Sequence, residues 1–242
     1  MKLAKLTFTH TDCIDVYRIY RSQMDRFFPN ELTERSFILS NCDHPDYDCD
    51  VLIYDETEAY PTRLTSGLLQ LKELGFDTIF FDHEDMFLYD YPDVDELLSY
   101  KRFMADKDYA HIRLIKGGRC LSRRDRTNPT LYRFLKLSPW IFSIQPSFWN
   151  IDCLLHILKK NMTCNIWELE ELSQKIVKKM SNNFAFSHRN GRRRGQYHFD
   201  NDVYPYIATA VGKGKWNFTE YESELRGLLE THGINKNDRG TF

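Results

Sequence analysis

The sequence predicts an α/β domain with a parallel or mostly parallel central sheet flanked by helices. Short apolar runs alternate along the chain with longer segments whose apolar residues recur at helical spacing. That alternation is typical of parallel strands joined by right-handed helical crossovers. The chain has 242 residues and a hydrophobic fraction of 42%, which is enough for one substantial core.

The first third of the chain shows the alternation clearly. Strands are expected at residues 3–9, 36–40 and 50–54. Helices are expected at residues 14–28 and 61–74. Pro29 follows the first helix and stops it, whereas Pro61 opens the second. Gly75 is a normal C-cap for the second helix.

The rest of the chain continues the pattern with longer loops. Further strands are expected at residues 79–81, 111–115 and 140–145. Further helices are expected at residues 94–106, 150–159 and 166–180. A last apolar segment, 204–211, runs into a glycine- and lysine-rich turn and then a polar helix. Residues 235–242 look like a flexible tail, so we expect a single domain over residues 1–234.

The strand at 79–81 ends abruptly in Asp82, His83, Glu84 and Asp85. Ionised carboxylates resist burial unless a cation or hydrogen bonds compensate them. The crevice outside the strand carboxyl ends is where open α/β sheets bind ligands. The sequence therefore predicts an active site here, with oxygen ligands that suit Mg²⁺ or Mn²⁺. The alternative is a helix N-cap, in which Asp82 caps and the other acids complement the helix dipole.

Composition narrows the class of protein. The chain has 33 Lys and Arg against 35 Asp and Glu, so a net charge of -2 gives no general attraction to nucleic acid. Its six cysteines are scattered and form no Cys-x-x-Cys pair, as expected for reduced thiols in the cytoplasm. We find no apolar stretch long enough for a signal peptide or a transmembrane segment.

Two kinds of basic segment also need an interpretation. Residues 212–215 read Gly-Lys-Gly-Lys, which lacks the spacing of a nucleotidase P-loop. Such a turn can still hold a diphosphate through charge and backbone N–H groups, or it can be a solvated basic turn. Residues 113–136 and 189–194 are rich in arginine and lysine. They support an alternative function as a nucleic-acid-binding protein or metal-dependent nuclease.

Three segments, in this order, resemble small glycosyltransferases of the GT-A type. The acidic strand end at 84–88 is similar to that group's Asp-x-Asp motif, although the strict motif is absent and both Asp82-x-Glu84 and Glu84–Asp85 are candidates. Residues 142–152 with Trp167-x-x-Glu170 resemble a strand followed by a tryptophan-containing helix start. Residues 211–216 resemble a Gly-Lys-Trp that closes over the donor. Viral and bacterial sugar transferases, a chlorella-virus capsid glycosyltransferase among them, share this arrangement.

The resemblance implies a role for each segment. Glu84 and Asp85 would bind Mn²⁺ or Mg²⁺, and a glutamate of the Trp167 helix would be the general base. Glu170 is favoured because it lies three residues from Trp167 on a helix, and Glu168 is second. The further donor-binding candidates are Thr9, Thr11, Arg63, Ser66, Asp82, Glu84, Lys213 and Lys215.

The implied activity is transfer of a sugar from a nucleotide-diphosphate donor to a hydroxyl group, with inversion and with a divalent cation. The donor would be linked to UDP, GDP or dTDP, and the acceptor would be a glycan or glycoconjugate. No nucleic-acid partner is expected under this interpretation. A catalytically inactive interaction protein with the same fold is a third possibility.

Overall fold

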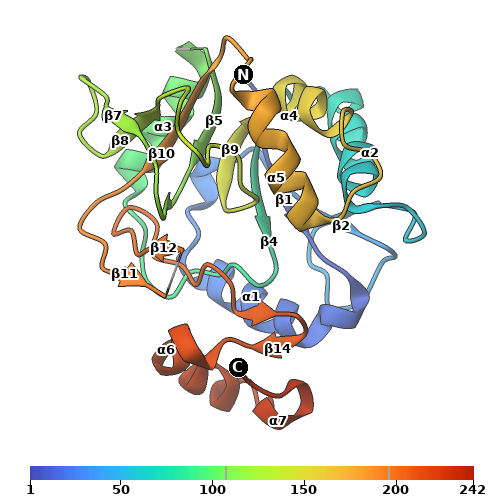
Figure 1. The fold of residues 1–242 in the computed structure, drawn as a ribbon. Coiled ribbons are helices and arrows are strands. Elements are labelled where there is room, and N and C mark those ends of the chain that lie inside the picture. Colours follow the sequence, from blue (N-terminus) through green and yellow to red (C-terminus); the bar gives the residue numbers. More distant parts are fainter. Residues whose placement is uncertain (107, 196) are drawn as a thin grey trace.

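A computed structural model describes residues 1–106, 108–195 and 197–242 (Figure 1). It confirms the predicted α/β fold. Nine strands form the central sheet, and the first four in spatial order are all parallel. These four are β3 (Asp50–Ile53), β2 (Arg35–Ser40), β1 (Leu3–Phe8) and β4 (Thr78–His83). Their carboxyl ends therefore meet at one edge of the sheet.

Beyond β4 the sheet is mixed. The next strands are β9 (Ser147–Asn150), β5 (Tyr109–Arg113), β10 (Asn183–Ser187), β8 (Leu131–Phe134) and β7 (Ser122–Arg124). Strand β9 is antiparallel to both neighbours, whereas β5 and β10 are parallel. Two small sheets complete the strands. One contains β6 (Lys116–Gly117), β11 (Arg193–Arg194) and β12 (His198–Phe199), and the other contains β13 (Val211–Gly212) and β14 (Lys215–Trp216).

Helices cover both faces of the sheet. Core residues on one face come from α1 (Ile14–Phe27), α3 (Val94–Asp106) and α6 (Phe218–Thr231). Those on the other face come from α2 (Tyr60–Glu73), α4 (Ile151–Leu158) and α5 (Ile166–Val177). Strand β4 serves both cores, because Phe80 faces one and Ile79 and Phe81 face the other. Within the described ranges, no helix is long and apolar enough to cross a membrane.

The prediction of a strand at residues 140–145 is wrong. This segment is irregular, and the strand of this region is β9, which starts after Pro146. The cause lies in where its backbone N–H groups bond. Those of Ile141 and Ile144 donate to side chains of α5, at 2.7 Å to Gln174 and 2.6 Å to Glu170. These amides are satisfied by side chains, so the apolar run does not need a ladder of strand hydrogen bonds.

The C-terminal residues, for which the sequence predicts a flexible tail, include regular structure. Residues 235–242 contain a short helix, α7 (Lys236–Arg239). The Phe242 N–H donates to the Trp216 carbonyl at 3.1 Å, and the Thr219 N–H donates to the Phe242 carbonyl at 2.9 Å. Figure 1 shows α6, α7 and β14 together beyond the end of β4, beside α1. The last residues therefore pack against the sheet edge where the parallel strands end.

Candidate active site

The site is organised by the segment that follows β4. Backbone N–H groups of residues 207 and 210 donate to the carbonyls of Phe87 (3.0 Å) and Asp85 (2.9 Å). The Tyr89 N–H donates in return to the Pro205 carbonyl at 3.1 Å. The two segments, 85–89 and 205–210, thus run side by side. This pairing brings the β13–β14 hairpin, which is next in sequence, to the acidic strand end.

Glu84 and Asp85 are both half-buried at this edge. Burial raises the pKa of both carboxyls, and the charge of Asp85 raises the pKa of Glu84 further. Neighbouring groups, besides the backbone of the two residues themselves, lower these pKa values. The Cys13 thiol donates to Glu84, the Arg239 charge lies near it, and the Val211 N–H donates to the Asp85 carboxylate. The two acids are therefore adjacent and only partly compensated.

This pair of carboxylates fits a hard divalent cation. Mg²⁺ is commonly held by one or two carboxylates together with substrate phosphates and water, and it prefers oxygen ligands. Among residues 1–106, 108–195 and 197–242 there is no group of three or more His, Cys, Asp and Glu side chains placed to hold a metal. Within these ranges, Glu84 and Asp85 are thus a pair of neighbouring carboxylates and not part of a larger cluster of such side chains.

Asp82 does not belong to this pair. Because side chains alternate along β4, Asp82 points under α1 with Phe80 and is fully buried. It accepts hydrogen bonds from Thr7 (2.8 Å) and Tyr20 (2.9 Å), and Lys5 lies 3.9 Å away. Its carboxylate is therefore occupied by a buried network. Of the two sequence alternatives, the geometry leaves Glu84–Asp85 at the mouth of the site.

The two glutamates of α5 have different surroundings. Glu168 is exposed and accepts from the Asn165 N–H at 2.9 Å, as part of a capping box. Glu170 is half-buried, and burial raises its pKa to about 7. One oxygen, Oε1, accepts from the Ile144 N–H at 2.6 Å, and the charge of Arg113 favours the ionised form. In the described part of the chain no hydrogen bond to its second oxygen is formed, so that atom can accept a proton.

Tyr60 connects Glu170 with the acidic strand end, and sequence reasoning missed it. Its hydroxyl lies 2.8 Å from His83 Nε2. Burial raises the pKa of Tyr60 well above its usual value, and the charges of Glu170, Glu84 and Asp85 add to this rise. One phenol thus lies within electrostatic reach of all three carboxylates. A signal existed, because the first residue of a helix that follows a parallel strand lies at the carboxyl edge of the sheet.

The two lysines lie on the β13–β14 hairpin. Its two central residues, Lys213 (φ 51°) and Gly214 (φ 78°), have positive φ, as a two-residue type I′ turn requires. Lys213 and Lys215 are exposed, whereas Trp216 between the hairpin and α6 is fully buried. The predicted glycine turn is confirmed. The buried Trp216 thus anchors a hairpin that carries two exposed lysines.

Thr9 and Thr11 follow β1 at the same edge. Thr9 is buried, and its carbonyl accepts from the Tyr54 hydroxyl at 3.0 Å. The Thr11 N–H donates to the Asn41 side chain at 3.0 Å, and Asn41 also donates to Glu56 at 3.1 Å. Loops after three parallel strands thus meet around Thr11 and Asn41.

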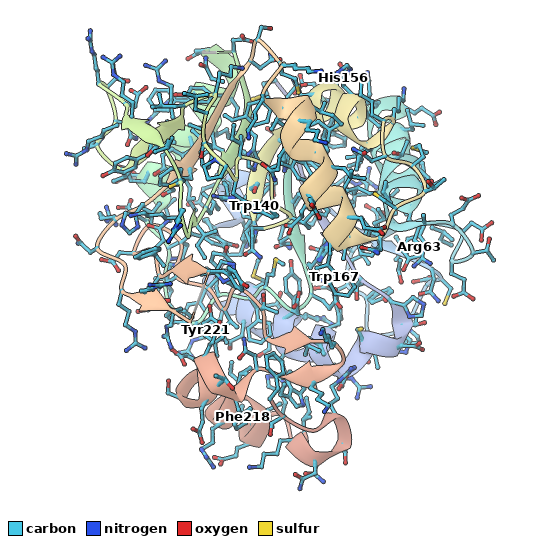
Figure 2. The ribbon with its side chains drawn as sticks, viewed as in Figure 1. Arg63, Trp140, His156, Trp167, Phe218 and Tyr221 are labelled. Atoms are coloured by element: carbon cyan, nitrogen blue, oxygen red, sulfur yellow. The ribbon has the colours of Figure 1, made fainter. Side chains whose placement is uncertain are left out.

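Arg63 and Ser66 lie on the first turns of α2. The Arg63 guanidinium donates to the Glu58 carbonyl at 2.6 Å and stacks over the Tyr54 ring, with its central carbon 5.2 Å from the ring centroid. Figure 2 labels Arg63 at the periphery of the view. Ser66 donates to the Arg63 carbonyl at 2.8 Å within the helix. Arg63 therefore borders the edge of the site, while Ser66 bonds within its own helix.

Arg239 is a second residue that sequence reasoning missed. It forms an ion pair with Asp15 at the start of α1, with 2.6 Å between Nε and Oδ2, and it donates to the Asp12 carbonyl at 3.0 Å. Its charge also acts on Glu84 and on Cys13. The C-terminal segment thus supplies a cation beside the acidic pair. No local sequence pattern marks this contact, since it joins residues at opposite ends of the chain.

The basic segments do not surround the acids. Arg113 is buried and donates to Ser143 at 2.6 Å, so it is not part of a solvent-exposed patch. Arg189 and Arg194 pair with carboxylates, Asp93 at 2.7 Å and Asp200 at 2.9 Å respectively. Strand β7 is five positions from β4 in the sheet, roughly 24 Å at about 4.8 Å per strand. These positions disfavour a nuclease in which the patches present nucleic acid to the acidic pair.

No known family and no curated protein sequence matches this chain. Solved structures with a similar arrangement include S. aureus TarS 1–349, with 13% identity, TM-score 0.49, and coverage of 98% of this chain and 66% of that one. Another is UDP-glucose pyrophosphorylase complexed with UDP-glucose (10% identity, TM-score 0.45, 96% and 98%). A third is a 4-diphosphocytidyl-2C-methyl-D-erythritol synthase from Anaerococcus prevotii (10% identity, TM-score 0.42, 71% and 83%). These low scores carry no conclusion about function, which depends on the residues of this chain.

Proposed function

We propose that this protein is a glycosyltransferase that moves a sugar from a nucleotide-diphosphate donor to a hydroxyl group of a glycan or glycoconjugate. The observation that carries the proposal is the placement of three features at one sheet edge. The pair Glu84–Asp85, the Lys213–Lys215 hairpin and Glu170 come from distant parts of the chain. Cation ligands, diphosphate-binding cations and a near-neutral carboxyl group are the parts that this reaction needs.

The donor half of the site would hold the nucleotide diphosphate. Glu84 and Asp85 would bind Mn²⁺ or Mg²⁺, which supplies Lewis-acid stabilisation of negative charge on the diphosphate. Lys213 and Lys215 would lie over the phosphates, because their turn is exposed and adjoins Asp85 through residue 210. Thr11, after β1, and Arg63, on the first turn of α2, would border the nucleoside.

The acceptor half would depend on Glu170. Its free oxygen would take the proton from the acceptor hydroxyl as the hydroxyl oxygen forms its bond to the anomeric carbon. The bond from that carbon to the diphosphate oxygen breaks, and its electron pair leaves with the nucleotide. Attack from the face opposite the leaving group inverts the anomeric configuration. A pKa of about 7 suits a base that works near neutral pH.

A thermal-shift screen tests this function. UDP, GDP and dTDP, each with and without Mn²⁺ or Mg²⁺, are compared with DNA and RNA on the intact protein. We expect at least one nucleoside diphosphate to raise the melting temperature, and more so with the cation, because a ligand that binds only the folded state stabilises it. Stabilisation by nucleic acid alone would favour the nuclease alternative. No shift with any nucleoside diphosphate would refute the transferase.

A further inference from the structure

Exposed apolar side chains gather on one surface away from the acidic pair. Leu137 is 84% exposed, and Leu135, Trp140 and Leu121 are 46%, 39% and 50% exposed. These four residues belong to the loop after β8 and to the start of β7, which it adjoins. The Leu135 N–H donates to the Leu121 carbonyl at 2.9 Å, so the two leucines are neighbours. We call these four residues the apolar loop surface.

The loop is held in shape by its own hydrogen bonds. The Ser138 N–H donates to the Leu135 carbonyl at 2.8 Å, which closes a turn with Lys136 and Leu137 at its tip. Ser138 is fully buried, and its hydroxyl accepts from the Leu121 N–H at 3.1 Å. The most exposed leucine of the chain thus stands on a tied turn. Exposure of this apolar side chain to water is unfavourable, and burial against a partner would remove that cost.

The α5 helix extends the same surface. The Ile141 N–H, next to Trp140, bonds to Gln174 of α5, and Lys136 bonds to the Met180 carbonyl just after the helix. Trp167 is 66% exposed and lies on the Gln174 side of α5, because the two are seven residues apart at about 100° per residue. In Figure 2 the labelled Trp140 and Trp167 both lie near α5.

Positive charge surrounds the four residues of the apolar loop surface. Residues 116–140 contain seven lysines and arginines and one acid, and residues 172–180 contain three lysines and no acid. The other end of α5 is acidic, because Glu168, Glu170 and Glu171 lie beside Trp167. The chain as a whole carries a net charge of -2, so this excess is local. Lys178 and Lys179, at the end of α5, form no ion pair with any of the described residues.

We propose that the apolar loop surface, with the lysines at the end of α5, docks on an anionic lipid bilayer. Cations attract the headgroups, while leucines and tryptophans enter the boundary between headgroups and acyl chains. Tryptophan is enriched at that depth because its ring has an apolar body and a polar edge. Nucleic acid would bind the cations, but it would offer no apolar partner for Leu137, which is 84% exposed at the tip of a turn.

The location has a consequence for catalysis that rests on the proposed function. Glu170 lies on α5 eight residues before Lys178, which is about two helical turns, so a lipid-anchored acceptor held at the lysines would lie close to the proposed base. Vesicle binding does not depend on transferase activity, so an experiment can refute the docking surface without refuting the transferase, and the reverse.

Co-sedimentation of the intact protein with vesicles tests the docking surface. Phosphatidylcholine vesicles are compared with vesicles that also contain phosphatidylserine, at low and at physiological salt. We expect binding to the anionic vesicles, weakened by salt. The double variant Leu137→Ser, Trp140→Ser should bind at least about tenfold more weakly. Lys178→Glu with Lys179→Glu should do the same, because each cation near such a surface contributes to binding.

Matched controls alter other surfaces by equivalent changes. Ile53→Ser removes an apolar residue that is 56% exposed on β3, and Arg226→Glu with Lys236→Glu reverses two charges near α7. Both should bind vesicles like the unmodified protein. Absence of binding to anionic vesicles would overturn the proposal, as would equal losses in the controls. Binding to duplex DNA or RNA that survives Leu137→Ser, or dimerisation that Leu137→Ser abolishes, would each assign the surface to another partner.

Discussion

Asp82 lies only two residues from Glu84 in the sequence, yet its surroundings differ from those of Glu84, Asp85 and Glu170. Asp82 is enclosed by Lys5, Thr7 and Tyr20, which supply a cation and two hydroxyl donors. Glu84 and Asp85 are adjacent acids, and the cation that acts on Glu84, Arg239, is already paired with Asp15. Glu170 has one backbone donor and an oxygen that no described residue contacts by a hydrogen bond.

The difference separates structural acids from acids that await a ligand. A buried charge with a complete set of partners adds to the fold and has no capacity left for substrate. Burial raises the pKa of all four carboxyls, Asp82 included, so their hydrogen-bond and charge partners distinguish them. A carboxyl group with an incomplete set of partners gains when a cation or a proton arrives. If this distinction holds, changing Asp82 should affect stability, whereas changing Glu170 or Asp85 should affect catalysis or ligand binding.

The largest effect is expected at Glu170. Replacing it with Gln removes the proton acceptor and should lower the transfer rate by about 10²–10⁴-fold, the usual contribution of a general base. Burial raises the pKa of Glu170 to about 7, so the carboxyl is protonated below that pH and ionised above it. Transfer by the unmodified protein should therefore rise with pH through about 7. Steady-state rates from pH 5.5 to 8.5 measure both effects.

Glu168→Gln is the matched control on the same helix. Its capping contact with Asn165 should cost at most about 1 kcal/mol of stability, with little effect on transfer. Full activity in Glu170→Gln, or loss that accompanies unfolding, would remove Glu170 from the mechanism. An unchanged pH profile in Glu170→Gln would assign the titration to another group.

Asp82→Asn should act on stability instead of substrate. It leaves the buried Lys5 ammonium without its carboxylate, and breaking such a pair typically costs about 3–5 kcal/mol. Urea denaturation measures this loss, and changing Lys5 to Met in the same chain should recover part of it. A stable Asp82→Asn protein that no longer binds nucleotide would contradict the assignment of Asp82 to a structural network.

Asp85→Asn is expected to have the smallest effect of the three, confined to ligand binding. Folding should be retained with a melting temperature close to that of the unmodified protein, because no cation among the described residues would be left unpaired by the change. Cation-dependent nucleotide affinity should fall by about 10- to 100-fold, as for other changes close to a bound metal. Calorimetry with and without Mn²⁺ gives the measurement. Unchanged affinity would shift the proposed metal ligand to Glu84 alone.

Much of this arrangement follows from local patterns. Apolar periodicity and proline and glycine positions predict α1, α2 and α3 within a residue or two, and the acids after β4 mark the site. The direction of Asp82 was also available, since a period of two places it on the Phe80 side of β4. Grouping Asp82 with its sequence neighbours overlooks that adjacent residues of a strand point to opposite faces of the sheet.

What the sequence could not supply are contacts between distant segments. The irregular stretch 141–145 has the composition of a strand, and only the side chains of α5 explain why its amides need no strand partner. Tyr60 becomes a site residue only when α2 and α5 are placed together. Composition also counted Arg113 as basic surface, whereas β5 buries it near Glu170.

The contact between Arg239 and Asp15 joins residues 224 positions apart. At about 5–20 residues per second, the ribosome takes on the order of 10–50 seconds to synthesise the chain between Asp15 and Arg239. The early strands and helices can pair during that interval, but the cation beside Glu84 is still being synthesised. The protein therefore gains the last charge of its acidic site only when translation has passed residue 239. A stop codon or a bulky fusion close to residue 239 acts at the centre of the site, although it lies 224 positions from Asp15 in the sequence.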